Sequence, residues 1–322
     1  MHIPVLQKEV LKYLDPKKNE NFIDCTAGGG GHALAILGKN GPAGKVLGVE
    51  TDPDLYKKLS SLKVKRLKLV RDSYVNLKGI VKKAKIRPIS GILFDLGLSS
   101  WHLQESNRGF SFRRNEPLDM RYNSETRAQN NFVLGRTHKI CAPNPLTAEK
   151  IANFWSRQDI EKILREYGEE RYASLIAEEI IKERSVKPIK KTFQLVDIIQ
   201  KAVPERYLKG RIHFATRTFQ ALRIAVNNEL NNLERALPQA LEVLKKDGRL
   251  VVISFHSLED RIAKNFFREK SAGKKNLFAE GLLKEELPLI KILTKKPVTP
   301  SFKETKSNPR SRSAKLRAVI KN

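Results

Sequence analysis

The stretch FIDCTAGGGGH at residues 22–32 decides the fold, together with VLGVE at residues 46–50. Each contains an apolar run that ends in a carboxylate, Asp24 in the first and Glu50 in the second, as two parallel strands ending at one sheet edge would. Four glycines after Asp24 let the backbone approach a ligand, and a helix over residues 33–37 opens behind them. Because four adjacent glycines cost more conformational entropy than a plain connection requires, the pattern predicts a nucleotide cradle.

The spacing of the glycines leaves two kinds of cofactor to compare. Gly28, Gly30 and Ala33 satisfy the dinucleotide pattern G-x-G-x-x-G/A, so a nicotinamide or flavin enzyme is one hypothesis. In such a site Asp24 would face the pyrophosphate, anion against anion. S-adenosylmethionine instead carries a sulfonium and an ammonium, which a carboxylate stabilises, and Glu50 can bind the ribose hydroxyls of either cofactor. The residues therefore favour S-adenosylmethionine.

Composition indicates the kind of partner. The chain has 322 residues with 62 Lys+Arg against 35 Asp+Glu, a net charge of +27, which is typical of proteins that bind a polyanion. A membrane is disfavoured because no apolar run approaches ~20 residues, and residues 1–4 lack the start of a signal peptide. Cys25 and Cys141 form no C-x-x-C pair, so we expect no metal site, a reducing cytoplasm, and Cys25 as a packed residue rather than a nucleophile.

The hydrophobic pattern predicts the domain organisation. Up to residue 104 helix and strand signals alternate, as in a parallel, doubly wound α/β sheet. Strands are expected over residues 22–24, 46–50, 66–70 and 89–95, and helices over residues 5–14 and 75–84. From 105 to 213 strand signals nearly vanish, and amphipathic helices are expected over residues 159–167, 172–183 and 192–201.

The last third of the sequence returns to the mixed pattern. We expect one long helix over residues 216–236, a following helix opened by Pro238, and late strands over residues 249–255 and 315–320 that complete the first sheet. The predicted domains are a core of residues 1–104 with 214–322 and an inserted helical domain of residues 105–213.

Several longer motifs follow the glycine loop in order. GILFDLGLSS at residues 91–100 is a buried strand that ends in Asp95, with small polar residues behind it at the edge where doubly wound enzymes keep their sites. The others are RGFSFR (108–113), PLDMR (117–121), YGEER (167–171), ATRTFQALR (215–223), SFHSLEDR (254–261) and NPRSRS (308–313). Together they closely resemble the bacterial 16S rRNA (cytosine-N4) methyltransferase family, RsmH, formerly MraW, from residue 2 to near the C-terminus.

The resemblance implies a class I S-adenosylmethionine-dependent methyltransferase with a Rossmann-like core and an inserted α-helical domain. Its implied activity is methylation of the exocyclic amine of a cytidine in the decoding region of small-subunit rRNA. Besides Asp24 and Gly28 of the cradle, it places cofactor contacts on Gly30, Gly31, His32, Glu50, Tyr74, Asp95 and His102. Glu50 replaces an aspartate of the family pattern, Tyr74 a phenylalanine and His102 a glutamine. Residues 123–146 form a longer segment than the pattern has there.

The chemistry of an exocyclic amine limits the candidate catalytic residues. The amine of cytosine is conjugated with the ring, so it attacks a methyl group well only when an acceptor holds its N–H bonds. Asp95, Ser99 and Ser100 could be that acceptor, and His256 could orient the substrate. The simpler alternatives are a strand-end cap for Asp95 and a turn residue for His256. Methylation at carbon would need a cysteine near this strand, and the sequence has none there.

Basic residues in the motifs are candidate RNA contacts. They are Arg108, Arg113 and Arg121, with Asp119 in the same motif as Arg121, and Arg310 and Arg312 near the C-terminus. The expected partner is 16S rRNA in the small ribosomal subunit, and the oligomeric state is left open, with a homodimer as one option. An RNA-binding assembly factor that holds S-adenosylmethionine as a structural ligand would have the same cradle and basic surface. The polar edge at residues 95–100 favours the enzyme.

Overall fold

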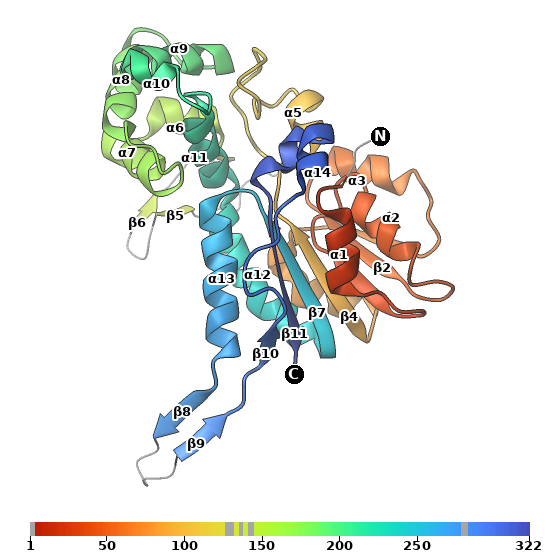
Figure 1. Cartoon of the computed structure of the whole chain (residues 1–322). Helices are drawn as coiled ribbons and strands as arrows, with labels where there is room; N and C mark the ends of the chain where they lie inside the picture. The colour runs from red at the N-terminus through yellow and green to blue at the C-terminus, as the bar shows by residue number, and fades with distance from the viewer. Residues whose placement is uncertain (1–3, 126–131, 135–137, 141–144, 278–282) are drawn as a thin grey trace. The chain divides into compact units, whose positions relative to one another are not determined.

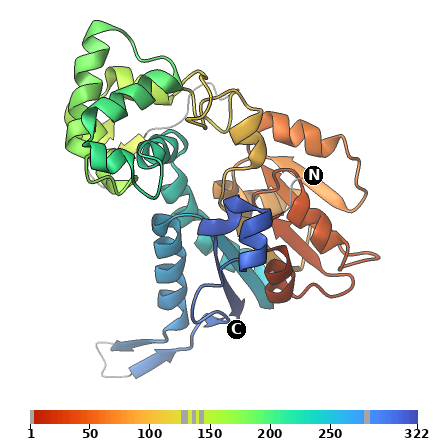
Figure 2. The same ribbon diagram turned by 45° about the horizontal axis from the view of Figure 1, so that its top comes forward.

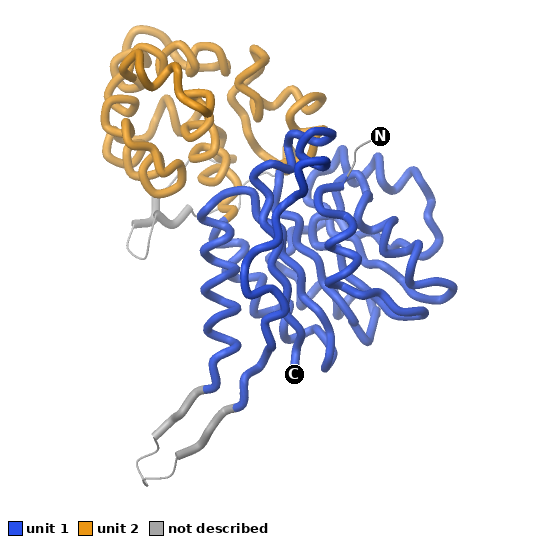
Figure 3. Tube along the Cα trace, viewed as in Figure 1, with its two compact units in different colours: residues 1–97, 230–322 blue, residues 98–229 orange. Residues whose placement is uncertain are grey.

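The structure is a computed structural model that describes residues 4–125, 132–134, 138–140, 145–277 and 283–322. Two compact units make up the chain (Figure 3). We call residues 1–97 with 230–322 the sheet unit and residues 98–229 the helical unit. Cys141 and much of the long segment 123–146 lie outside the described residues.

Seven described strands of the sheet unit form one sheet in the order β10-β11-β7-β4-β1-β2-β3 (Figure 1). Their bounds are β1 Asn21–Asp24, β2 Val46–Glu50, β3 Leu67–Arg71, β4 Ile89–Asp95, β7 Leu244–Ser254, β10 Ile290–Ile292 and β11 Lys315–Lys321. β11 runs antiparallel to both of its neighbours, and the strands from β7 to β3 pair in parallel. The strand order reverses between β1 and β4, the position at which doubly wound sheets bind their ligands.

Successive residues of the central strands fill two separate cores, because side chains alternate between the faces of a strand. Phe22 and Leu93 pack with α1 (Gln7–Leu14) and α2 (Gly31–Leu37). Ile23 and Phe94 pack on the other face of the sheet, and the helices there are α4 (Leu77–Ala84), α12 (Glu229–Val243) and α13 (Ser257–Ser271). Figures 1 and 2 show the sheet between these helices. The expected doubly wound sheet is confirmed.

The remaining elements of the sheet unit are short. They are α3 Pro53–Ser60, η1 Tyr74–Asn76, α14 Phe302–Ser307, η2 Pro309–Ser313 and a separate hairpin of β8 Lys274–Leu277 with β9 Leu283–Glu286. Since β11 pairs with the last residues of β7, α14 and η2 precede β11 at the carboxyl edge of the sheet. None of the helices in the described ranges is long and apolar enough to cross a membrane.

The helical unit has a core of its own. Its elements are α5 Ser100–Gln104, β5 Phe132–Leu134, β6 His138–Ile140, α6 Ala148–Phe154, α7 Arg157–Glu166, α8 Ala173–Val186, α9 Thr192–Ala202, α10 Glu205–Leu208 and α11 Thr216–Asn227. Buried residues such as Ile151, Ile163 and Ile176 come from successive helices. Ser156 caps α7 by accepting from the backbone N–H of Asp159, which begins the helix two residues before the expected 159.

Two expectations about residues 214–243 are wrong. The single helix over 216–236 is two helices, because Asn228 adopts a left-handed conformation with φ 53° that ends α11. Pro238 lies inside α12 and does not open a helix. The helical unit runs to Glu229, and Phe219 and Leu222 of α11 belong to its core. The domain boundaries inferred from sequence stay a prediction.

Candidate cofactor and active site

The glycine loop connects β1 to α2 at the switch point of the sheet. Gly30 precedes the first residue of α2 and has φ +82°, which L side chains rarely adopt. A Cβ on Gly31 would lie 2.4 Å from Cγ of the Pro4 ring. The loop therefore requires glycine at these two positions, and the first residue of α2 has no side chain.

Glu50 at the end of β2 holds the glycine loop in position through hydrogen bonds to backbone N–H groups. Its Oε2 accepts from the backbone N–H of Gly28 at 2.7 Å, and its Oε1 accepts from that of Asp52 at 2.8 Å. Burial raises the pKa of Glu50 to about 7, although these two N–H groups oppose the shift. Each carboxylate oxygen can accept a further hydrogen bond, which leaves Glu50 able to bind a ribose hydroxyl. The expected contact with a ribose stays a prediction.

Asp24, His32 and Asp95 form a buried polar group beside the loop. Asp24 ends β1 with 1% exposure, and burial raises its pKa to about 6 while the charge of His32 opposes the shift. Nε2 of His32, in the first turn of α2, lies 3.5 Å from Oδ2 of Asp95 at the end of β4. Burial lowers the pKa of His32, but Asp95 and then Asp24 outweigh it, so the net pKa is raised.

This polar group is incompletely satisfied. Within the part of the chain that the structure describes, neither ring nitrogen of His32 nor Oδ1 of Asp95 has a hydrogen-bond partner, although all three atoms are buried. The 3.5 Å contact is close enough for an ion pair but is not a hydrogen bond. Buried polar atoms in proteins nearly always have partners. Open bonding positions at a glycine loop therefore indicate a ligand site.

The charge of this site discriminates between the cofactors. Two carboxylates, Asp24 and Asp95, lie close enough that the charge of Asp95 contributes to raising the pKa of Asp24. A pyrophosphate at this place would add a third anion, whereas a sulfonium or an ammonium would relieve the repulsion. The residues fit S-adenosylmethionine and disfavour a dinucleotide.

Two further residues contact β4, the strand that ends in Asp95. Tyr74 opens η1 after β3 and meets Phe94 of β4 edge-on, with ring centroids 5.5 Å apart. Sequence reasoning missed Thr26, whose Oγ1 accepts from the backbone N–H of Asp95 at 2.8 Å and so ties the loop to β4. Its signal was a hydroxyl residue two positions after the end of the first strand. Cys25 is buried and its pKa is raised well above normal by burial, as expected of a packed residue.

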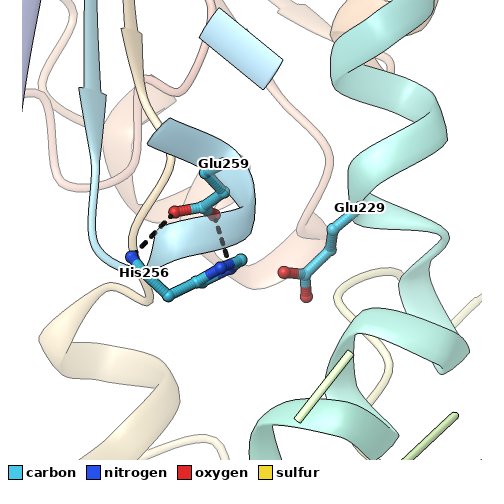
Figure 4. A group of neighbouring side chains, drawn as sticks. All are labelled: Glu229, His256 and Glu259. Carbon is cyan, nitrogen blue, oxygen red and sulfur yellow. Dashed lines mark hydrogen bonds and ion pairs between the residues drawn. The ribbon is translucent and has the colours of Figure 1, made fainter. Parts of the chain in front are cut away.

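His256 lies at the end of β7, the strand beside β4, and precedes the first turn of α13 (Figure 4). Glu259 holds this turn: its Oε2 accepts from the backbone N–H of Phe255 at 2.8 Å and from that of His256 at 3.4 Å. Its Oε1 lies 3.2 Å from Nε2 of His256. Sequence reasoning missed Glu259, although a glutamate three residues into a helix is a known capping signal.

Three candidates belong to the helical unit and have their contacts there. Ser99 caps α5, and its Oγ lies 2.8 Å from Nδ1 of His102. His102 is buried and packs edge-on against Phe110 and Tyr122. Ser100 is the first residue of α5. Their roles in catalysis and cofactor binding stay predictions.

The candidate RNA contacts differ in whether their side chains already bind other groups of the protein. Arg108 is buried, donates to the carbonyls of Arg121 and Tyr122, and lies over the Trp101 ring. Arg121 forms a two-bond ion pair with Asp119, at 2.6 and 2.7 Å, which raises the pKa of Arg121. These residues have structural tasks within the helical unit. Arg113, Arg310 and Arg312 are exposed.

A doubly wound sheet with an anionic cradle at its switch point defines a class I enzyme core of the methyltransferase type. The MraW methylase family matches residues 1–140 and 137–322, and the chain belongs to this family.

Curated relatives match nearly the whole chain. The "Ribosomal RNA small subunit methyltransferase H" of Heliobacterium modesticaldum is 44% identical over 99% of this chain and 98% of its own length. The protein of the same name from Sulfurihydrogenibium sp. is 42% identical over 98% of this chain and 97% of its own. A solved structure of a putative methyltransferase from Streptococcus mutans with SAH covers 100% of both chains at 12% identity and a TM-score of 0.42, too low to add to the assignment.

Proposed function

We propose that this protein transfers a methyl group from S-adenosylmethionine to N4 of a cytidine in the decoding region of 16S rRNA in the small ribosomal subunit. The observation that carries the proposal is the buried group of Asp24, His32 and Asp95, in which atoms of His32 and Asp95 have no hydrogen-bond partner in the described ranges, beside a glycine loop in a chain of the MraW methylase family. The relatives are named as methyltransferases of small-subunit ribosomal RNA. Its place of action is the cytoplasm.

The cradle residues would hold the cofactor. The glycine loop and the start of α2 give backbone N–H groups and close approach, and Asp24 neutralises positive charge. Glu50 keeps the loop in shape and can accept from ribose hydroxyls, while Tyr74, which follows β3, packs edge-on against Phe94 of β4. When bound, S-adenosylmethionine supplies an electrophilic methyl group.

Asp95 is the proposed acceptor for the substrate amine. Its Oδ1 is buried without a partner in the described ranges, and its backbone is fixed to the glycine loop through Thr26. An acceptor there would hold an N–H of the cytosine amine, direct its lone pair away from the carboxylate, and take up positive charge as it develops. Ser99, Ser100 and His256 stay the alternative candidates, and His256 is held in place by Glu259.

The helical unit and the C-terminal segment would bind the RNA backbone. A base can be methylated on its amine only after it leaves its stack, which costs a few kcal/mol that contacts to the surrounding backbone must offset. The helical unit, with Arg113, and the C-terminal segment, with Arg310 and Arg312, offer exposed cations for these contacts.

The deciding experiment is a mass-spectrometric map of modified cytidines in rRNA from cells that lack this protein. We expect loss of N4 methylation at one decoding-site cytidine, restored by the wild-type gene. An unchanged map would overturn the proposal. Transfer of a tritiated methyl group to small subunits by the purified protein separates an enzyme from an assembly factor, which would bind the subunits without labelling them.

A further inference from the structure

A stack of three aromatic rings lies at the surface of the helical unit, and the chemistry above does not use it. His213 lies face to face with Phe112, with centroids 4.4 Å apart and an interplanar angle of 13°, and with Phe214 at 4.3 Å and 24°. Two rings this close to a third fit only on its opposite faces, so His213 is the middle ring. Phe219 of α11 meets Phe112 edge-on at 5.5 Å and joins the stack to the core.

The protonation of His213 follows from one hydrogen bond. The backbone N–H of Ala215 lies 3.2 Å from Nδ1 of His213. A backbone N–H can only donate, so Nδ1 accepts, and the proton of the neutral ring is on Nε2. Burial and then the charge of Arg113 lower the pKa of His213. At pH 7 the stack is therefore neutral, with an N–H donor at Nε2.

Two arginines without a carboxylate partner in the described ranges lie close to the stack in sequence, and the charge of Arg113 acts on His213. Arg113 follows Phe112 and Arg211 precedes His213 by two residues, and both are exposed. In the described ranges neither guanidinium has a carboxylate partner, whereas Arg165 of the same unit pairs with Glu161 at 2.7 Å. Exposed guanidinium groups without a carboxylate partner attract anions such as phosphates.

The exposure of the stack separates it from ordinary packing. The unit has a second ring cluster, in which Phe110 stacks on Tyr122 and His102 packs edge-on against both. In that cluster Phe110 is 5% exposed and His102 is 6% exposed, as expected of rings that only stabilise a core. His213, in contrast, is exposed, and Phe112 and Phe214 are half-buried.

Flat neutral rings, with guanidinium groups one and two residues away in sequence that have no carboxylate partner in the described ranges, match the chemistry of a nucleotide. Aromatic side chains stack on bases of any sequence, and arginines bind the phosphates on either side. An acidic peptide would use the guanidinium groups but would gain little from the face of an aromatic stack. Single-stranded RNA is therefore the occupant that uses every part of this surface.

We propose that Phe112, His213 and Phe214, with Arg113 and Arg211, bind a single-stranded nucleotide of the substrate RNA. Phe214 ends the stack and receives the base, His213 donates from Nε2, and the two guanidinium groups hold phosphates. This inference rests on the proposed function, because it takes RNA as the substrate.

The stacking role is tested by comparing two ligands in the full-length protein. Fluorescence anisotropy measures binding of a short single-stranded RNA and of an abasic oligonucleotide of equal length. Phe214→Leu should weaken RNA binding about tenfold or more and leave the abasic ligand nearly unaffected. Phe154→Leu, at a 71% exposed phenylalanine on α6, is the matched control and should change neither. Unchanged RNA binding by Phe214→Leu, or an equal loss with both ligands, would overturn the proposal.

Two conservative variants test the polar contacts. His213→Phe keeps three rings and removes the donor, so RNA binding should weaken about fivefold. Arg113→Gln should lower the salt dependence of binding by about one phosphate contact, and Lys187→Gln, at an exposed lysine of the same unit, should not. Affinity for S-adenosylhomocysteine should stay at the wild-type value throughout. A wild-type protein that does not methylate small subunits would refute the proposed function, whereas active enzyme with RNA binding insensitive to these changes would refute the stack alone.

Discussion

Burial of the Asp24 carboxylate destabilises the folded protein when this group is ionised. Its pKa of about 6 exceeds the ordinary 3.8, so the folded protein holds this proton more tightly than the unfolded chain does. The cost to stability is complete above pH 6 and is lost as the pH falls through 6 toward 3.8. Asp24→Asn should therefore stabilise the ligand-free protein at pH 8 by up to about 3 kcal/mol, at ~1.4 kcal/mol per pKa unit.

The same substitution should weaken S-adenosylmethionine binding by about ten- to a hundredfold, because a charge-assisted hydrogen bond is lost. Thermal unfolding from pH 5 to 8 and calorimetry measure the two effects on one variant. The stability gain should shrink between pH 7 and pH 5 as the wild-type carboxylate becomes protonated. Equal stability at all pH values, or unchanged affinity, would contradict the assignment of Asp24 to the cationic end of the cofactor.

Asp95 is expected to act on the rate. If its carboxylate accepts the hydrogen bond of the reacting amine, Asp95→Ala should lower the single-turnover methylation rate about a hundredfold or more. The measurement uses saturating S-adenosylmethionine and enzyme in excess over small subunits, since Asp95 also lies in the cradle beside His32. Asp247→Asn removes an exposed carboxylate near the other end of the neighbouring strand β7 and should leave the rate unchanged.

Recovery of the wild-type rate by Asp95→Ala at saturation would show that Asp95 only binds cofactor. The acceptor role would then pass to Ser99, Ser100 or His256, or catalysis would rest on positioning alone.

At the scale of elements, the turn between α11 and α12 depends on one residue. Asn228 has φ 53°, and its N–H donates to the carbonyl of Ile224, which closes α11. Asn228→Gly should change the free energy of unfolding by less than about 0.5 kcal/mol, because glycine has no Cβ to oppose this conformation. Asn228→Ala should cost about 1 kcal/mol, because alanine keeps the Cβ but loses the short polar side chain that can hydrogen-bond locally in the left-handed region. At Asn231, inside α12, the preference should reverse, with alanine better than glycine by about 0.5–1 kcal/mol. Urea denaturation that ranks the substitutions alike at both sites would contradict this account.

The same turn shows what sequence periodicity can and cannot predict. Apolar residues recur at helical spacing from Phe219 through Val226 to Leu233, so the pattern predicts the buried faces. It does not show that Asn228, between them, adopts a left-handed conformation and ends the first helix. Strands were easier to predict than helix ends. The strands of a parallel sheet are apolar on both faces, so they appear in the sequence as continuous apolar runs, as residues 46–50 and 89–95 do. The three-residue β10 gave no such run.

The site residues also fall into those that the sequence could predict and those that it could not. Residues at strand ends, such as Asp24, Glu50 and Asp95, could be predicted because the carboxyl ends of parallel strands share an edge. Contacts that depend on tertiary placement could not: Thr26 holds the backbone of Asp95, 69 positions along the chain, through its hydroxyl. Glu259 is different, because it holds the turn at His256 from three residues away and a capping pattern could have predicted it. The ring stack at His213 also escaped notice, since it joins residues 112 and 213 across about a hundred positions of chain.

At the scale of the whole molecule, the cations behind the net charge of +27 have different roles. Many cations are used within the structure: Arg108 on two carbonyls, Arg121 on Asp119, Arg317 on Asp260. Those at the C-terminal segment are different, because Arg310 and Arg312 are exposed on η2 at the carboxyl edge of the sheet. Total charge attracts RNA from a distance, but only cations at such positions can form phosphate contacts near the site.

Replacing Arg310 and Arg312 by alanine should weaken binding of small-subunit RNA and flatten its salt dependence. Each lost phosphate contact in a single strand lowers the slope of log K against log salt by about 0.7, so the pair should account for at most about 1.4. Affinity for S-adenosylhomocysteine should not change, because neither side chain shapes the cradle. Lys82→Ala with Lys83→Ala removes the same charge from the exposed side of α4 and serves as the control. Equal slopes for both double variants would mean that net charge alone governs binding; a smaller slope only for the arginine pair assigns the phosphate contacts to η2.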